Sequence, residues 1–179
     1  MSNDLAGRHH VVLSGCSGGG KSTLSAELAR RGFPTVPEPG RRIVEDERRG
    51  AGTALPWVDL AAFARRAIEM ASRDREETAS STGWVFFDRS LVDAVVALRH
   101  ATGASIPLES HERYHSKVFL APPWPDIYVA DRERPYDLDG AIAEYDRLFA
   151  SYGDLGYETI LLPKVGVVER ADFVLHHLR

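Results

Sequence analysis

The stretch GCSGGGKS, residues 15–22, constrains this 179-residue chain more than any other. It fits the pattern G-x-x-x-x-G-K-[ST] without a gap, and it lies between an apolar run and a helical pattern that begins at Lys21. Glycines let backbone N–H groups turn inward and approach phosphate oxygens closely, and the N-terminus of the following helix attracts the same anion. The stretch therefore predicts a strand, a phosphate-binding loop and a helix, with a nucleotide bound at the loop.

The residue types in this loop predict how the nucleotide is held. Lys21 is expected to reach the β- and γ-phosphates, facing phosphate and not the core, and Ser22 is expected to offer its hydroxyl to Mg²⁺. Cys16 is interpreted as a small loop residue without a redox role. The predicted cofactor-binding residues are Gly15, Ser17, Gly18, Gly19, Gly20, Lys21, Ser22 and Thr23.

Composition and charge limit the classes of function. The chain has 44% hydrophobic and 27% charged residues, with no apolar run near the ~20 residues of a membrane-spanning helix and no signal-peptide pattern at its start. Its net charge of -4 argues against nucleic acid as a partner, because non-specific binding needs a basic surface. A single cysteine excludes an internal disulfide framework. We expect a soluble, cytoplasmic protein with no membrane partner.

Short apolar runs alternate with longer helical patterns along the chain. This alternation predicts an α/β fold in which helices cover both faces of a parallel sheet. Ligands of such sheets bind outside the carboxyl ends of the strands, so functional residues should follow each strand. Gly153 is the expected stop of the fourth helix, whose expected apolar face includes Phe149 and Tyr152; Val168 is expected on the apolar face of the fifth. Strands are expected at 9–15, 33–38, 84–88, 126–130 and 158–163, and helices at about 21–31, 57–77, 90–100, 141–153 and 168–178.

Charged residues follow the second and third expected strands. Glu38 can accept a proton from a substrate hydroxyl, and Arg41 and Arg42 either grip a phosphate or carboxylate or are simply solvated. Asp88 follows an apolar strand as a Walker B carboxylate does, and would hold Mg²⁺ directly or through water. Arg89 beside it can neutralise phosphate.

The segment after the fourth expected strand, residues 131–140, contains Arg132 and Arg134. A loop that delivers arginines can stabilise a transferring phosphoryl group, and the alternative is a charged surface turn. His111 and His115 are spaced i, i+4 but lack a third ligand, which argues against a metal site. The stretches at 112–117 and 174–179 are interpreted as solvated helix faces.

These stretches together resemble the P-loop AAA-type predicted ATPases and kinases. They are similar to ribosyl-nicotinamide kinase domains and, more distantly, to nucleoside and nucleoside-monophosphate kinases. The resemblance implies one nucleotide-binding domain over residues 1–179, with a lid at about 131–140 and a five-stranded parallel sheet. Its central strand would carry the P-loop, with the Asp88 strand beside it. The implied metal ligands are Ser22 and Asp88, Glu38 is the implied base, and the implied catalytic set is Lys21, Glu38, Asp88, Arg89, Arg132 and Arg134.

The function predicted from these features is phosphoryl transfer from Mg²⁺-ATP to a small molecule, such as a nucleoside or nucleotide-like metabolite. The acceptor would lie under the helix at 57–77, where Phe63 is a candidate lining residue, although residues 50–81 match no acceptor pocket of the relatives. One alternative is a stand-alone or partner-dependent ATPase or nucleotide switch, which needs no acceptor pocket. Another is a polynucleotide-end kinase, which needs a basic groove. The sequence leaves open the acceptor, ATP or GTP as donor, whether Glu38 or Asp88 is the base, and the oligomeric state.

Overall fold

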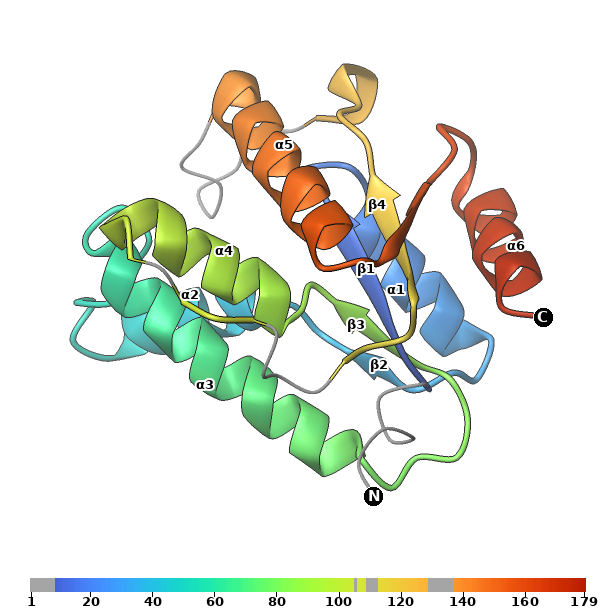
Figure 1. Cartoon of the computed structure of the whole chain (residues 1–179), viewed down its shortest axis with the longest axis horizontal. Helices are drawn as coiled ribbons and strands as arrows, with labels where there is room; N and C mark the ends of the chain where they lie inside the picture. Colours follow the sequence, from blue (N-terminus) through green and yellow to red (C-terminus); the bar gives the residue numbers. More distant parts are fainter. Residues whose placement is uncertain (1–8, 105, 109–112, 129–136) are drawn as a thin grey trace.

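The computed structural model describes residues 9–104, 106–108, 113–128 and 137–179. Within these residues the chain forms a five-stranded parallel sheet with the strand order β2-β3-β1-β4-β5 (Figure 1). The predicted fold class is therefore confirmed, with the P-loop strand central and the Asp88 strand beside it. The strands are β1 His10–Gly15, β2 Thr35–Val36, β3 Val85–Asp88, β4 Lys117–Ala121 and β5 Glu158–Leu161.

The register of the sheet brings the ends of three strands together at one edge. Leu13 of β1 lies opposite Asp88 of β3, and Gly15 of β1 lies opposite Ala121 of β4. All six residues of β1 are buried, because neighbouring strands and helices cover it on every side. The residue types explain this position, since a nearly continuous apolar run suits a strand that is buried on both faces.

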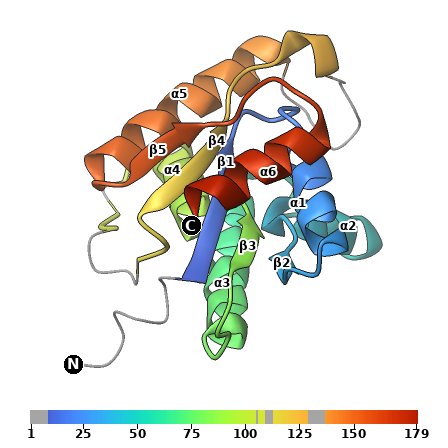
Figure 2. The same ribbon diagram turned by 90° about the vertical axis from the view of Figure 1, so that its right-hand side faces the viewer.

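Two helical layers enclose the sheet (Figure 2). Alternate strand residues face the two layers: Val12 and Phe87 belong to the core beneath α3, α4 and α5, whereas Leu13 and Phe86 belong to the core beneath α1 and α6. Helix α2 packs against α3. The helices are α1 Lys21–Arg30, α2 Pro39–Arg49, α3 Leu60–Thr78, α4 Leu91–Thr102, α5 Leu138–Asp154 and α6 Val167–His177.

The fourth strand lies earlier in the chain than the sequence predicts. Residues 117–121 form β4, whereas Pro125–Ile127, which overlap the start of the strand expected at 126–130, form the short 3₁₀ helix η2. Of the stretch expected to be a solvated helix face at 112–117, the described residues 113–117 instead lead into β4, with Tyr114 buried. The apolar run at 118–121 is selected because its alternate residues fill both cores at once.

Helix boundaries and faces also differ from expectation. Helix α2 was not expected, and α5 begins at Leu138, inside the segment assigned to the lid. Helix α5 continues past Gly153, and Gly156 with a φ of 74° follows its end. Phe149 and Val168, expected on apolar faces, are 43% and 50% exposed. None of the helices in the described ranges combines the length and apolar composition needed to cross a bilayer.

Candidate active site

The P-loop turns sharply between β1 and α1, and its glycines make the turn possible. Gly15, Gly18 and Gly20 have φ values of 105°, 76° and 80°, in the left-handed region that side chains with a Cβ rarely adopt. A Cβ on Gly15 would lie 2.4 Å from the Ala121 carbonyl oxygen of β4. The loop therefore packs directly on the neighbouring strand, and its backbone leads into the first turn of α1.

Lys21 begins α1 and lies beneath the loop. Its Nζ donates a hydrogen bond of 2.7 Å to the Cys16 carbonyl and a longer one of 3.5 Å to the Gly15 carbonyl. The side chain lines the site cavity but is only 5% exposed. It is buried because the loop folds over it and provides acceptors. Burial lowers the pKa of Lys21, and the nearby Arg89 charge lowers it further.

Ser22 and Asp88 meet at the carboxyl edge of the sheet although they come from α1 and β3. Ser22 Oγ donates a 2.7 Å hydrogen bond to Asp88 Oδ2. Asp88 is 3% exposed, and its Oδ1 atom is buried without a hydrogen-bond partner among the described residues. Burial, followed by the charge of Glu38, raises the pKa of the Asp88 carboxyl. A hydroxyl beside an unpartnered carboxylate oxygen is a donor set that suits Mg²⁺, which prefers oxygen ligands.

Arg89 is held at the centre of a group of three carboxylates. Its Nε lies 3.2 Å from Glu38 Oε1, and its Nη1 lies 3.2 Å from Glu144 Oε1 and 3.3 Å from Asp93 Oδ1. Burial would lower the pKa of the guanidinium, but the charges of Glu144, Glu38 and Asp93 together raise it. Its φ of 68° is the one positive value at a non-glycine position among the described residues, a conformation that is strained for a side chain of this size.

Asp93 is a site residue that the sequence reasoning missed. It lies in the first turn of α4, where its carboxylate accepts hydrogen bonds from the Ser90 backbone N–H, the Ser90 hydroxyl and the Tyr152 hydroxyl at 3.1, 2.9 and 2.6 Å. Its other oxygen accepts a 2.5 Å hydrogen bond from Ser14 Oγ of β1. The spacing Ser90-x-x-Asp93 is a capping-box pattern and could have pointed to this residue. No comparable sequence pattern pointed to Glu144 as a site residue.

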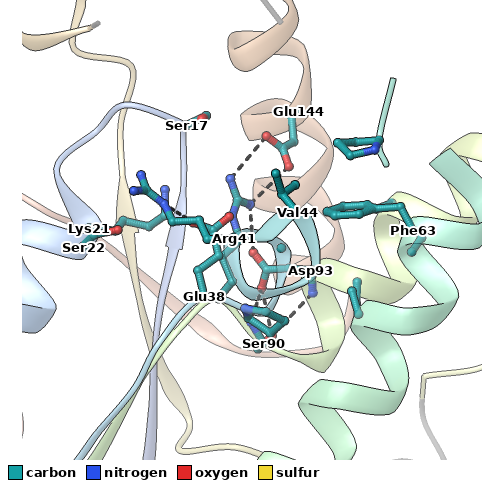
Figure 3. A pocket seen from close by; sticks show the side chains of 18 of the residues that line it. Ser17, Lys21, Ser22, Glu38, Arg41, Val44, Phe63, Ser90, Asp93 and Glu144 are labelled. Atoms are coloured by element: carbon teal, nitrogen blue, oxygen red, sulfur yellow. Dashed lines mark hydrogen bonds and ion pairs between the residues drawn. The ribbon is translucent and has the colours of Figure 1, made fainter. Parts of the chain in front are cut away.

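One cavity of about 350 Å³ joins the P-loop to an apolar compartment under α3 (Figure 3). Lys21 and Ser22 lie at one end, Phe63 and Val44 lie at the other, and Glu38, Arg41, Asp93 and Glu144 lie between them. Its volume is within the range of small-molecule sites. The apolar compartment is lined by Pro39, Val44, Pro56, Phe63, Ala64, Ala67, Ala94 and Ala97.

The structure brings most predicted residues to this cavity, but not all. Glu38 precedes α2 and lines the cavity with Arg41, whose Nε lies 3.4 Å from Glu38 Oε2. Arg42 pairs with Asp74 of α3 and does not line the cavity. Arg132, Arg134 and His111 lie outside the described residues. The predicted loop residues that line the cavity are Ser17, Gly18, Gly20, Lys21, Ser22 and Thr23.

Comparisons with known proteins agree with this architecture. A family model described as an AAA domain matches residues 10–170. The structure is similar to that of the NadR protein in complex with NR, with a TM-score of 0.72 and 17% identity over 96% of this chain and 52% of that one. This chain therefore spans about half the length of the NadR chain. No curated protein sequence gives a significant match.

Two kinases that match over nearly their whole length show the same fold. Shikimate kinase from Acinetobacter baumannii in complex with shikimate has a TM-score of 0.60 and 16% identity, over 94% of this chain and 92% of the kinase. Deoxyadenosine kinase from M. mycoides with bound products has a TM-score of 0.54 and 16% identity, over 94% of this chain and 98% of the kinase. At these identities the likeness establishes the fold.

Proposed function

The chain belongs to the AAA domain family, and from that premise we propose that it transfers the γ-phosphoryl group of ATP to a hydroxyl of a small acceptor. The observation that carries this proposal is the single cavity that runs from the P-loop into an apolar compartment. A stand-alone ATPase or nucleotide switch needs no such compartment. A polynucleotide-end kinase needs a basic groove, whereas both arginines that line this cavity are paired with carboxylates.

The proposed roles follow from the positions of the side chains. Ser22 and the unpartnered Oδ1 of Asp88 would hold Mg²⁺, which supplies charge neutralisation between the phosphates. Lys21 is the cation nearest the loop and would exchange its carbonyl acceptors for phosphate oxygens. Glu38 lies between the P-loop and the apolar compartment, so it is the carboxylate placed to accept the proton of the attacking hydroxyl.

The charges around the apolar compartment favour an uncharged, hydroxyl-bearing acceptor. Glu38, Asp93 and Glu144 surround Arg89, which is engaged by all three, and Arg41, the other arginine that lines the cavity, is paired with Glu38. An acceptor with its own phosphate or carboxylate would meet these carboxylates without a free counterion in the described part of the site. Phe63 and the surrounding small apolar side chains suit a flat ring, which is the shape of a nucleobase. A nucleoside-like acceptor fits both features.

The proposal is tested by incubating the protein with γ-labelled ATP, Mg²⁺ and a panel of acceptors. The panel contains nucleosides, nicotinamide riboside, shikimate and nucleoside monophosphates, so that neutral and anionic acceptors are compared directly. We expect label on an uncharged nucleoside-like acceptor and its loss in Glu38→Gln. Label on inorganic phosphate alone, at the same rate with and without every acceptor, would establish an ATPase instead.

Cytoplasmic location, expected from the sequence, is part of the same proposal. ATP is abundant in that compartment, and the single cysteine, Cys16, is buried as a free thiol. A reducing environment is compatible with that state.

A further inference from the structure

Arg170 lies on α6, outside the cavity, with its guanidinium against the P-loop. The side chain is 3% exposed, and its Nη1 lies 3.5 Å from the Gly20 carbonyl oxygen. A Cβ added to Gly20 would lie 2.6 Å from this Nη1 atom. The guanidinium therefore fits at this position because Gly20 has no side chain. The guanidinium also lies over the ring of Trp124, whose centroid is 5.6 Å from the Arg170 Cζ.

This cation is buried without a counterion. Among the described residues no carboxylate forms an ion pair with Arg170, and its Nε and Nη2 atoms are buried without a hydrogen-bond partner. Burial alone lowers the pKa of Arg170, with no charged neighbour acting against it. A buried charge that is neither paired nor fully hydrogen-bonded destabilises a fold, because it loses its hydration without gaining a partner. An apolar side chain of similar length would pack at this position without that cost.

We propose that the counterion of Arg170 is the polyphosphate of the bound nucleotide, on the other side of the P-loop. The electrostatic coupling between Arg170 and the phosphates would pass through the peptide unit between Gly20 and Lys21. The Gly20 carbonyl of this unit also accepts a 3.1 Å hydrogen bond from the Leu24 N–H in the first turn of α1. The amide partner of that carbonyl is the Lys21 N–H, at the start of the helix. Donation to the carbonyl polarises the peptide and makes this N–H a stronger donor to phosphate. Arg170 is thus a positioning residue for the triphosphate, and this inference rests on the nucleotide binding contained in the proposed function.

The proposal requires opposite effects of one substitution on two properties. Removing the charge in Arg170→Met should leave the unfolding temperature of the ligand-free protein unchanged or higher. The same variant should bind Mg²⁺-ATP about tenfold more weakly, the size of effect expected from losing a coupling between a buried charge and a nearby anion. Arg170→Lys keeps the charge and should retain most of the affinity.

Arg31 provides a matched control at the contact between α1 and α6. Its guanidinium is paired with Glu27 and Asp172 and donates to the Val168 carbonyl, so it is an arginine of the same region with partners of its own. Arg31→Met should lower the unfolding temperature and leave the affinity for Mg²⁺-ATP unchanged. The two variants together separate loss of a structural arginine from loss of an electrostatic contact with nucleotide.

The measurements are thermal unfolding without ligand and calorimetric titration with Mg²⁺-ATP and with inorganic tripolyphosphate. Equal weakening of both ligands in Arg170→Met supports the assignment to phosphate. Weakening of ATP alone would assign Arg170 to the base and overturn it, as would a lower unfolding temperature with unchanged affinity. Binding is read without turnover, so a protein that binds Mg²⁺-ATP but phosphorylates no acceptor would refute the proposed kinase activity and leave this inference standing.

Discussion

Lys21 illustrates at the residue scale how a binding group can be held ready by the loop it serves. Its ammonium is satisfied by the Cys16 carbonyl, an acceptor that a phosphate oxygen can replace. We expect Lys21→Ala to weaken Mg²⁺-ATP binding by about ten- to a hundredfold, the loss of a charge-assisted hydrogen bond, with the far-ultraviolet circular dichroism unchanged. Lys117→Ala is the control, because Lys117 Nζ makes the same 2.7 Å contact with the His177 carbonyl outside the cavity. Equal affinities of Lys21→Ala and wild type would contradict the assignment.

Asp88, the proposed Mg²⁺ ligand, makes the stability of the site depend on pH. Its carboxyl pKa is raised, so between the ordinary aspartate pKa of about 3.9 and the folded value the native state binds the proton more tightly. The contribution of Asp88 to the unfolding free energy is therefore fully present below pH ~4 and is lost as pH rises through the folded pKa. We expect Asp88→Asn to flatten this fall in chemical denaturation series, and to abolish the dependence of ATP affinity on Mg²⁺. Parallel pH profiles for variant and wild type would show that the carboxylate is not destabilised by its burial.

At the scale of elements, alanine substitutions at two glycines are expected to change the free energy of unfolding in opposite directions. Gly15→Ala places a Cβ against Ala121 of β4 at a φ of 105°, so we expect a destabilisation of about 3 kcal/mol or more. Gly153→Ala lies in α5 with no atom near the new methyl group, and should stabilise by about 0.5–1 kcal/mol. Urea denaturation of both variants measures the difference. A tolerated alanine at Gly15 would mean that the loop can move away from β4.

The Asp93 carboxylate joins β1, α4 and α5 in one buried network. Asp93→Asn replaces an acceptor by a donor among groups that already donate, and we expect it to lower the unfolding free energy by about 2–4 kcal/mol. Tyr152→Phe removes the hydroxyl that contacts both Asp93 and Ser90 at 2.6 Å, and should cost about 1–2 kcal/mol. Equal losses in the two variants would show that the Tyr152 contact dominates the network.

The local sequence pattern predicted most of the helices and strands. It failed where two apolar runs lie close together along the chain. The runs at 118–121 and 126–130 both have β-branched or aromatic residues, and it is the first that pairs with β1 and β5 and fills both cores. Pairing of this kind joins residues far apart in the chain and is invisible to local periodicity. The basic residues before the first run also suggested a helix face, although Tyr114 is buried there.

At the scale of the whole molecule, one cavity contains both the P-loop end and the apolar compartment. A substitution in the apolar compartment should therefore affect acceptor phosphorylation without affecting ATP binding. Ala97 of α4 lines the apolar compartment, and phenylalanine there would occupy the space proposed for the acceptor. We expect Ala97→Phe to reduce acceptor phosphorylation at least about tenfold while the Mg²⁺-ATP dissociation constant changes less than about twofold. Calorimetry and the labelled-ATP assay together measure both. A parallel loss of ATP affinity would show that the compartments are not independent.

The sequence motifs say more about the P-loop end of this cavity than about its apolar compartment. The P-loop and the Ser22–Asp88 contact follow from strand ends that any parallel sheet brings together. Arg42 shows the limit of that reasoning, because it follows the same strand as Arg41 yet turns to Asp74 on α3. The direction of each side chain depended on how α2 and α3 pack, and residues 50–81 carried no motif to predict it.

The position in the chain of the residues that line the apolar compartment has a consequence for how the proposed acceptor specificity can change. Pro39, Val44, Pro56, Phe63 and Ala67 all come from one uninterrupted segment between β2 and β3, whereas the P-loop belongs to β1 and α1. Exchange of that segment as a cassette would alter substrate choice and leave the phosphate-handling machinery intact. The face of α3 that packs on α4 would have to be kept, as would the contacts of Thr78 with His10 and of Arg75 with Tyr114. A recombination library confined to residues 39–78 is thus the shortest route to new acceptors on this scaffold.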